Sequence, residues 1–465
     1  MDLQMLQFYG GYLDESSSTS SSMPPMKPHV LFFTDPLGIN AVQLHSLARD
    51  LASAIPEAAF TFLGDQETLL SLRHATPNIK LISFDHCIPN AEFSAGFFER
   101  FLAEGTQIYN RMLRVAALME GRPVTCVISD AFMWIAESVP DVKMPLWIAC
   151  YFGFSLAMLA YALTDRFLCI YGDDEDNAAV SQESLSILPI FKKMRVCDLP
   201  DDILFGHHRA FHLKNIRKIL TTAEIVIFPC LPIFLDEATF RYAGIKCGLP
   251  IYPHSLLSPI SLSCYEEECL QWLNNCLALS VVYIFFDVSS TSTLPLAELI
   301  EVAHGLEDSN VHFLWSIKEE HRSCLPEGFI DRTRHIGMLV SWTPHQSVLT
   351  HPSVALFVGL SGWKEVFQCF QAGVPMLLRS FNGEGSMIAR AVQEIWGAGK
   401  KFDSRIQRWW LRRAIEAILW GDKGNQMRLR ARELGIRIMG STFADGSFSN
   451  NFHHLVKVIR KEETI

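Results

Sequence analysis

The chain has 465 residues, of which 49% are apolar and 19% are charged, and its formal net charge at pH 7 is −10. This composition can bury a large core, which excludes a chain disordered throughout, and the length suggests two domains of roughly 200 residues each. The negative charge argues against nucleic acid or an anionic membrane surface as the main partner, because both repel an acidic protein.

The first 27 residues form a leader that is rich in serine. Such a segment cannot bury a core, so we expect it to be disordered. The N-terminus shows no charged segment followed by an apolar run, and no apolar stretch reaches the length of a membrane span. The 12 cysteines occur singly, without the spacing of a zinc site. We therefore expect a cytoplasmic monomer with no bound metal and no membrane span.

Buried strands alternate with helices in the first half of the chain. The apolar run at 29–33 is followed by a helical pattern over about 40–55. Similar short apolar runs occur at 60–63, 125–129 and 225–228, and the run at 125–129 is followed by a second helical pattern. Repeated units of this kind predict a parallel sheet with helices on both faces.

A second series of the same kind occupies the rest of the chain. It begins at 281–286 and continues at 311–315, 354–358 and 374–378, and a closing helix is predicted at 448–460. The whole pattern predicts an α/β protein with two doubly wound, Rossmann-like domains that face each other across a cleft. The predicted segments are a leader at 1–27, an N-terminal domain at 28–250, a linker at 251–265, a C-terminal domain at 266–445 and a C-terminal helix at 446–465.

The segment from Trp342 to Gly385 reads WTPHQSVLTHPSVALFVGLSGWKEVFQCFQAGVPMLLRSFNGEG. It resembles the donor-binding signature of plant UDP-glycosyltransferases, which runs roughly WAPQ…HPSVGAFLTHCGWNS…E…GVP…DQ. The segments at 124–137 and 269–284 also resemble this family, in particular its flavonoid and anthocyanidin 3-O-glucosyltransferases. The residues in register with the signature include Trp342, Pro344, His351, Pro352, Gly362, Trp363, Gly373, Val374 and Pro375.

The resemblance implies a GT-B fold, in which the N-terminal domain binds the acceptor and the C-terminal domain binds the nucleotide sugar. Members of the family move a sugar from UDP to a phenolic hydroxyl with inversion. The expected partners of this chain are therefore a small phenolic or flavonoid and a UDP-sugar as co-substrate, with no bound cofactor.

The resemblance places the catalytic pair at Asn40 and Asp130. In the family a histidine follows the first strand and accepts the proton of the acceptor hydroxyl, and an aspartate orients it. Asn40 stands at the position of the base, and an amide has no basic lone pair near neutral pH. His45 lies five positions on, about 140° around a helix, so we expect it to face elsewhere. Asp130 has the alternative role of capping the helix that follows it.

The donor contacts that the resemblance implies are altered at several points. The pyrophosphate-binding histidine is replaced by Leu360, and an acid, Glu365, stands where the family has serine. A glycine of the first loop of the second domain is replaced by Asp287, and the last glutamine of the signature by Gly385. We therefore expect weak UDP-glucose binding. The candidate donor-binding residues are Ser316, Trp342, Thr343, His345, Gly362, Trp363, Lys364, Gln368 and Glu384.

The tryptophans of this set have an alternative role in core packing. The acceptor side retains an aromatic lining, which predicts a hydrophobic cavity for planar phenolics. Its candidate residues are Phe132, Phe152, Tyr161 and Phe381.

Three functions remain open from the sequence. The first is an ordinary glycosyltransferase of flavonoid-like phenolics with unusual substitutions. The second is a repurposed enzyme that uses the aromatic pocket for sugar-independent chemistry, such as a condensation or cyclisation. The third is a catalytically silent flavonoid-binding or regulatory protein.

Overall fold

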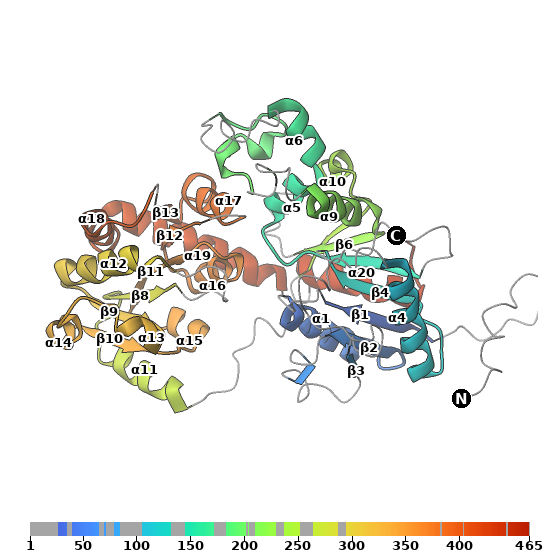
Figure 1. Cartoon of the computed structure of the whole chain (residues 1–465), viewed down its shortest axis with the longest axis horizontal. Coiled ribbons are helices and arrows are strands. Elements are labelled where there is room, and N and C mark those ends of the chain that lie inside the picture. Colours follow the sequence, from blue (N-terminus) through green and yellow to red (C-terminus); the bar gives the residue numbers. More distant parts are fainter. Residues whose placement is uncertain are drawn as a thin grey trace, which may run out of the picture.

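The chain folds into two α/β domains that lie side by side (Figure 1). The structure is a computed structural model, and it describes residues 27–34, 40–64, 69–70, 79–83, 105–131, 145–171, 183–200, 203, 210–228, 237–251, 264–286, 294–381, 384–402, 404–442 and 445–464.

Seven parallel strands form the sheet of the first domain, in the order β3-β2-β1-β4-β5-β6-β7. Every residue of β1, β2, β4 and β6 is buried, as the continuous apolar runs of these strands predict for a sheet that is covered on both faces. The strand order reverses between β1 and β4, where Phe33 pairs with Ser129. The strands are β1 His29–Phe33, β2 Ala59–Gly64, β3 Ile79–Ser83, β4 Cys126–Asp130, β5 Leu146–Cys150, β6 Ile225–Phe228 and β7 Gly248–Pro250.

Helices cover both faces of this sheet. The helix α1 follows β1 directly and buries one side, and it ends at a 55–58 turn that leads into β2. The helices of this domain are α1 Ala41–Ala54, α4 Gly105–Glu120, α5 Ser155–Ala162, α6 Thr164–Tyr171, α9 Ala210–Thr222 and α10 Glu237–Ala243, with short 3₁₀ turns at Pro189–Phe191 and Val196–Asp198.

The second domain repeats the arrangement with six parallel strands in the order β10-β9-β8-β11-β12-β13. The order reverses between β8 and β11, and open α/β sheets usually bind ligands at the carboxyl ends of the strands at such a point. The strands are β8 Val281–Phe285, β9 His312–Ser316, β10 Gly337–Val340, β11 Val354–Leu360, β12 Met376–Arg379 and β13 Gly399–Lys401.

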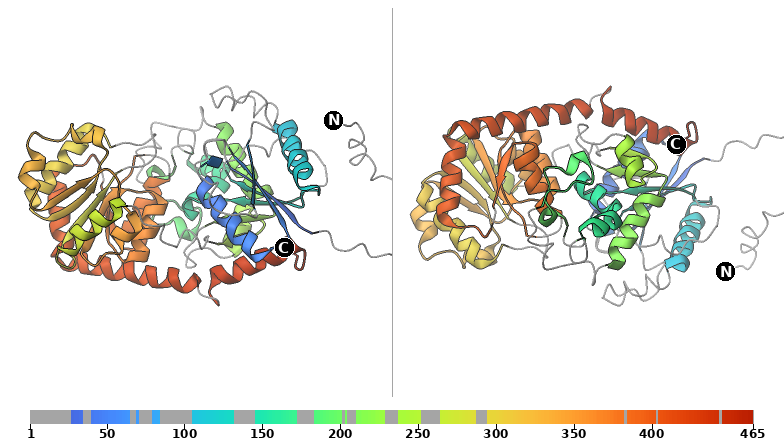
Figure 2. Two further views of the ribbon diagram at one scale, coloured as in Figure 1. Left: turned by 90° about the horizontal axis from the view of Figure 1, so that it is seen from below. Right: turned by 90° about the horizontal axis from the view of Figure 1, so that it is seen from above.

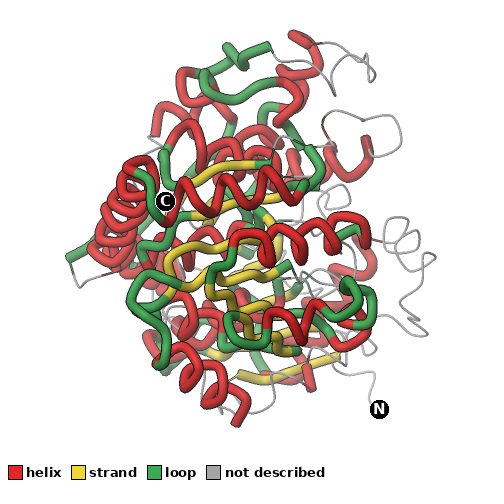
Figure 3. Tube along the Cα trace, turned by 90° about the vertical axis from the view of Figure 1, so that its left-hand side faces the viewer, coloured by secondary structure: helices red, strands yellow, loops and turns green. Residues whose placement is uncertain are grey.

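The helices of the second domain surround its sheet (Figure 3). Most of them follow a strand of the sheet, and α17 continues into one π-helical turn at Ala391–Ile395. The helices are α11 Cys264–Asn274, α12 Leu296–Ser309, α13 Glu319–Arg322, α14 Phe329–Thr333, α15 His345–Leu349, α16 Trp363–Ala372, α17 Gly385–Arg390, α18 Arg408–Leu419 and α19 Asp422–Thr442.

The last helix, α20 (Ser447–Arg460), returns to the first domain. Together α19 and α20 run along one side of both domains (Figure 2). Leu455 and Ile459 are buried in the same apolar cluster as residues of α1 and β1. The side chain of Arg460 donates to Glu57 Oε1 at 2.7 Å and to the carbonyl of Ala54 at 3.1 Å. The end of the chain is therefore part of the first domain's core.

The fold predicted from the sequence is confirmed as two doubly wound, Rossmann-like domains. The strands predicted at 29–33 and 225–228 have the predicted bounds. The leader, Phe132, Asp287 and most of the predicted linker lie outside the described residues. Among the described residues, no helix is both long and apolar enough to cross a membrane.

Candidate functional site

The predicted catalytic pair lies at the point where the first sheet reverses its strand order. Asn40 precedes α1, and Asp130 is the last residue of β4. The side-chain Nδ2 of Asn40 donates a hydrogen bond to Asp130 Oδ2 at 2.8 Å, and Asp130 is fully buried. The structure therefore brings the two residues together, and the amide of Asn40 takes the place of a proton acceptor beside the carboxylate.

His45 does not reach this pair. Its ring is buried within the first domain and packs edge-on against Phe62, with the ring centroids 5.4 Å apart. Burial and the positive charge of Arg49 lower the pKa of His45 to about 4, so the ring is neutral at physiological pH. This agrees with the expectation that His45 faces away from the site.

The start of α16 is occupied by an acidic side chain. Gly362 caps this helix, and the carboxylate of Glu365 folds back so closely that a Cβ on Gly362 would collide with it. Burial raises the pKa of Glu365, while a hydrogen bond from its own backbone N–H and the charge of Lys364 oppose the shift. The positive end of the helix, which would attract a phosphate, is already covered by the carboxyl group of Glu365.

Leu360, which ends β11, is 6% exposed and packs in the core on the α12 and α18 side of the sheet. Its side chain offers no hydrogen bond to a ligand at this strand end.

The residues after β10 combine an exposed aromatic ring with a buried hydrogen-bond network. The side chain of Trp342 is 52% exposed, so its face is accessible to a planar ligand. The hydroxyl of the fully buried Tyr283 lies 2.6 Å from Thr343 Oγ1 and 2.8 Å from His345 Nδ1. Burial and the charge of Lys364 lower the pKa of His345 to about 3, so this histidine is a neutral group.

Three donor-site candidates carry buried polar atoms without a hydrogen-bond partner among the described residues. These atoms are His345 Nε2, Gln368 Oε1 and Trp363 Nε1. Because buried polar atoms are normally satisfied, an unpaired group of them indicates a place where a polar ligand or water binds. The ring of Trp363 also packs against Phe154 of the first domain, with the ring centroids 5.3 Å apart. Trp363 therefore contributes to the packing between the two domains.

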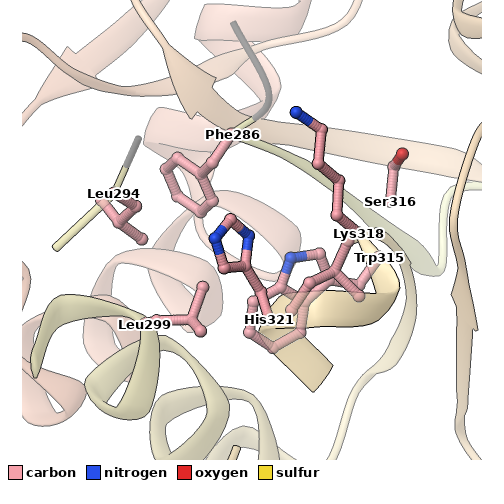
Figure 4. Close-up of a pocket in the computed structure, with 8 residues that line it drawn as sticks. Phe286, Leu294, Leu299, Trp315, Ser316, Lys318 and His321 are labelled. Atoms are coloured by element: carbon pink, nitrogen blue, oxygen red, sulfur yellow. The ribbon is translucent and has the colours of Figure 1, made fainter. Parts of the chain in front are cut away.

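Ser316 lies at the end of β9 and lines a small recess with Phe286, Trp315, Lys318 and His321. Figure 4 shows the imidazole of His321 between Phe286 and Leu299 in this recess. The enclosed space is about 30 Å³, which accommodates water molecules but not a sugar ring or a base.

Glu384, the acid of the signature that would contact sugar hydroxyls, instead reaches the first domain. Its Oε2 accepts hydrogen bonds from the hydroxyl of Tyr151 at 2.8 Å and from the backbone N–H of Phe154 at 3.0 Å. Burial raises the pKa of Glu384, and these two donors oppose the shift. The next residue, Gly385, is so close to Ser361 that a Cβ at this position would lie 2.8 Å from the Ser361 hydroxyl.

The predicted acceptor residues do not form one group in the described structure. Phe152 is buried in the cluster on the α1 face of the first sheet, and Tyr161 is buried in the cluster on the opposite face. Phe381 packs beneath the guanidinium of Arg379, with Cζ 4.5 Å from the ring centre. The acceptor lining stays a prediction, since Phe132 lies outside the described residues.

Two site residues were not singled out from the sequence. Tyr151 directly follows β5, and Tyr283 lies within β8. The only available signal was a tyrosine within or at the end of a buried apolar run, where its hydroxyl must find a partner.

Taken together, the two reversed-order sheets and the strand ends that carry these residues define a two-domain nucleotide-sugar transferase fold of the GT-B type. A crystal structure of a UDP-glucose:anthocyanidin 3-O-glucosyltransferase in complex with UDP superimposes with a TM-score of 0.82 at 27% identity, covering 94% of this chain and 100% of that one.

Sequence comparisons agree with the fold. The family model for UDP-glucuronosyl and UDP-glucosyl transferases matches residues 266–432. UDP-glycosyltransferase 78D3 of Arabidopsis thaliana is 30% identical over 94% of this chain and 98% of its own length. An anthocyanidin 3-O-glucosyltransferase of Zea mays is 32% identical over 94% of this chain and 98% of its own length. The chain belongs to the UDP-glycosyltransferase family.

Proposed function

We propose that the chain is a divergent UDP-glycosyltransferase that binds flavonoid-like phenolics and in which ordinary glucosyl transfer from UDP-glucose is strongly impaired. The names of two similar proteins, both anthocyanidin 3-O-glucosyltransferases, support the acceptor class. The observation that carries the proposed impairment is the hydrogen bond from Asn40 Nδ2 to Asp130 Oδ2 at 2.8 Å.

This bond bears on how the proton of the acceptor hydroxyl could be removed. Transfer to a phenol requires a group that accepts the hydroxyl proton as the oxygen attacks the sugar. The amide of Asn40 donates one N–H to Asp130 and leaves its second N–H and its carbonyl oxygen for a ligand. These groups orient a hydroxyl but do not deprotonate it. Losing a positioned general base typically reduces the rate by about 10²- to 10⁴-fold.

The donor side supports the same conclusion. A charged carboxylate at Glu365 faces the position where the helix start would hold a diphosphate. Two like charges about 4 Å apart repel by about 4 kcal/mol at an effective dielectric constant of about 20, roughly a thousandfold in affinity. The family fold therefore persists with weakened donor contacts.

The direct test replaces Asn40 with the base. We expect Asn40→His to raise glucosylation of a flavonol by about 10²- to 10⁴-fold at neutral pH, because an imidazole with a pKa near ~6.5 accepts the proton. Adding Asp130→Ala should remove most of the gain, since Asp130 would orient the ring. Asn275→His, at an exposed position on the second domain, is the matched control.

If Asn40→His leaves glucosylation at background while UDP-glucose binds, the missing base is not the reason for impairment and the proposal fails.

The anion at the helix start favours a second candidate, a protein that binds phenolics without sugar transfer, either silent or with sugar-independent chemistry. Titration of UDP by calorimetry separates this candidate from a transferase. Product analysis of phenolic substrates with and without UDP-glucose then separates a silent binder from a repurposed enzyme. Loss of a sugar-independent product in Asn40→His would make Asn40 a working residue of that chemistry.

A further inference from the structure

Glu384 connects the two domains through one oxygen atom. It immediately precedes α17 in the second domain, while both of its donors lie in the β5–α5 connection of the first domain, which α17 faces (Figure 1). The Tyr151 hydroxyl and the Phe154 N–H both donate to Oε2. A carboxylate oxygen has two lone pairs in the plane of the group, so these two donors use the accepting capacity of Oε2.

The β5–α5 connection is shaped to make this contact. Gly153 lies between the two donors, and a Cβ on this residue would lie 2.5 Å from Glu384 Oε2 and 2.9 Å from Oε1. Only a glycine therefore allows the backbone to approach the carboxylate so closely.

Aromatic packing holds the contact in place. The ring of Phe154 lies 5.3 Å from that of Trp363 and 5.7 Å from that of Trp396, measured between centroids. Both tryptophans belong to the second domain, so the backbone N–H that binds Glu384 is anchored on the same side as the acid. The position of Oε2 is fixed by the domain interface.

The consequence concerns the sugar of a bound nucleotide sugar. A carboxylate that binds two neighbouring hydroxyls uses both of its oxygens. Among the described residues, both hydrogen bonds to Glu384 end on Oε2, so Oε1 alone remains for a sugar hydroxyl. Turning Oε2 toward a sugar would leave the buried Tyr151 hydroxyl without this acceptor, which is unfavourable.

We propose that Tyr151 determines donor selectivity in this protein by holding Oε2 of Glu384 away from the sugar. The hexose of a UDP-hexose then adds little to the affinity of the UDP part. This inference rests on the proposed function, in which the second domain still has a weakened site for a UDP-type nucleotide.

The test compares the affinities for UDP and for UDP-glucose by calorimetry on the full chain. Wild-type protein should bind the two within about threefold of each other. Tyr151→Phe removes only the hydroxyl and should tighten UDP-glucose about tenfold relative to UDP, because Glu384 Oε2 then becomes available to a sugar hydroxyl. Tyr242→Phe, an exposed tyrosine of the same domain, is the matched control and should leave the ratio unchanged.

The outcomes separate this inference from the proposed function. A wild-type protein that binds UDP-glucose at least tenfold more tightly than UDP overturns the inference, even if Tyr151→Phe does not fold. The inference also fails if Tyr151→Phe weakens UDP-glucose or leaves the ratio unchanged, because Tyr151 would then serve the sugar site or only the interface. If wild-type protein binds neither nucleotide, this inference is overturned, whereas the proposed impairment of glucosyl transfer stands and is tested separately by Asn40→His.

Discussion

At the scale of single residues, the substituted side chains of the site are held by other parts of the protein. The amide of Asn40 donates to Asp130, and Nδ1 of His345 lies against the hydroxyl of Tyr283. Glu365 sits over the start of its own helix. Each of these groups therefore offers a ligand less than its residue type suggests.

Reversal of two donor-site residues should restore nucleotide-sugar binding. Leu360→His with Glu365→Ser adds a hydrogen-bond donor and removes a negative charge, so we expect UDP-glucose to bind at least about tenfold more tightly, or about 1.4 kcal/mol. Gly385→Gln is left out, because a side chain there meets the Ser361 hydroxyl. Calorimetry measures the change, and Glu416→Ser on the outer face of α18 is the control. A wild-type dissociation constant in the low micromolar range would show that the donor site is not weakened.

His345 should make stability depend on pH. Burial lowers the pKa of His345 to about 3 in the folded protein, against the ordinary histidine value of 6.5, so the unfolded chain binds the proton first. Stability is therefore present above about pH 6.5 and is lost as pH falls toward 4, by at most about 1.4 kcal/mol per pH unit from one group. His345→Gln should reduce this slope in urea unfolding series and leave the part due to His45, whereas the exposed His335→Gln should keep the whole slope. Identical slopes in all three proteins would contradict the buried, neutral state of His345.

At the scale of elements, α20 belongs to the core of a domain from which it is distant in sequence. Leu455→Ala should destabilise the first domain by about 2–5 kcal/mol, because Leu455 is fully buried against that core. Leu429→Ala, 60% exposed on the neighbouring helix α19, should change the stability by less than about 0.5 kcal/mol. Thermal unfolding followed by circular dichroism measures both. Equal effects would show that α20 does not support the domain.

Element prediction succeeded where the apolar pattern had clear limits. The run His29–Phe33 is bounded by polar and turn residues, and the strand has the predicted ends. The strands β5 and β10 were not predicted: Leu146–Cys150 is a short apolar run that periodicity cannot distinguish from a buried helix, and Gly337–Val340 is only half-buried at the edge of its sheet.

The candidate site was predictable only in part. Register with the family signature places Glu384 without any structure. The resemblance after the first strand and at 124–137 places Asn40 and Asp130 in the same way. Their hydrogen bonds were not predictable, since the partners of Glu384 lie 233 and 230 residues away along the chain. Such contacts depend on how the domains meet, which no local pattern of residues encodes.

At the scale of the whole molecule, a buried acid joins the two domains beside the site. Asp198 of the first domain is 1% exposed and lies 3.6 Å from Arg390 and 3.4 Å from Lys401 of the second. Arg195 of its own domain also pairs with it, at 3.2 Å. Three cations therefore surround a single carboxylate at the interface.

Removing this charge should loosen the interface. Asp198→Asn leaves the cations uncompensated, and we expect a loss of about 3 kcal/mol in stability together with a larger radius of gyration in small-angle scattering. Asp165→Asn, whose side chain is 61% exposed and pairs with Arg217 within the first domain, is the control. An unchanged radius and an unchanged melting temperature would show that the interface does not depend on Asp198.

The return of α20 to the first domain has a consequence for how the chain can be divided. The polypeptide passes between the domains twice, once between β7 and α11 and again between α19 and α20. A fragment that stops at residue 250 would therefore lack the helix that seals its own hydrophobic face. Expressed alone, that fragment should aggregate, whereas co-expression with the remaining fragment should give a soluble nicked protein, with α20 supplied from the second piece. The first domain can therefore be completed by a separate polypeptide that carries α20, but it does not fold as an independent unit without that helix.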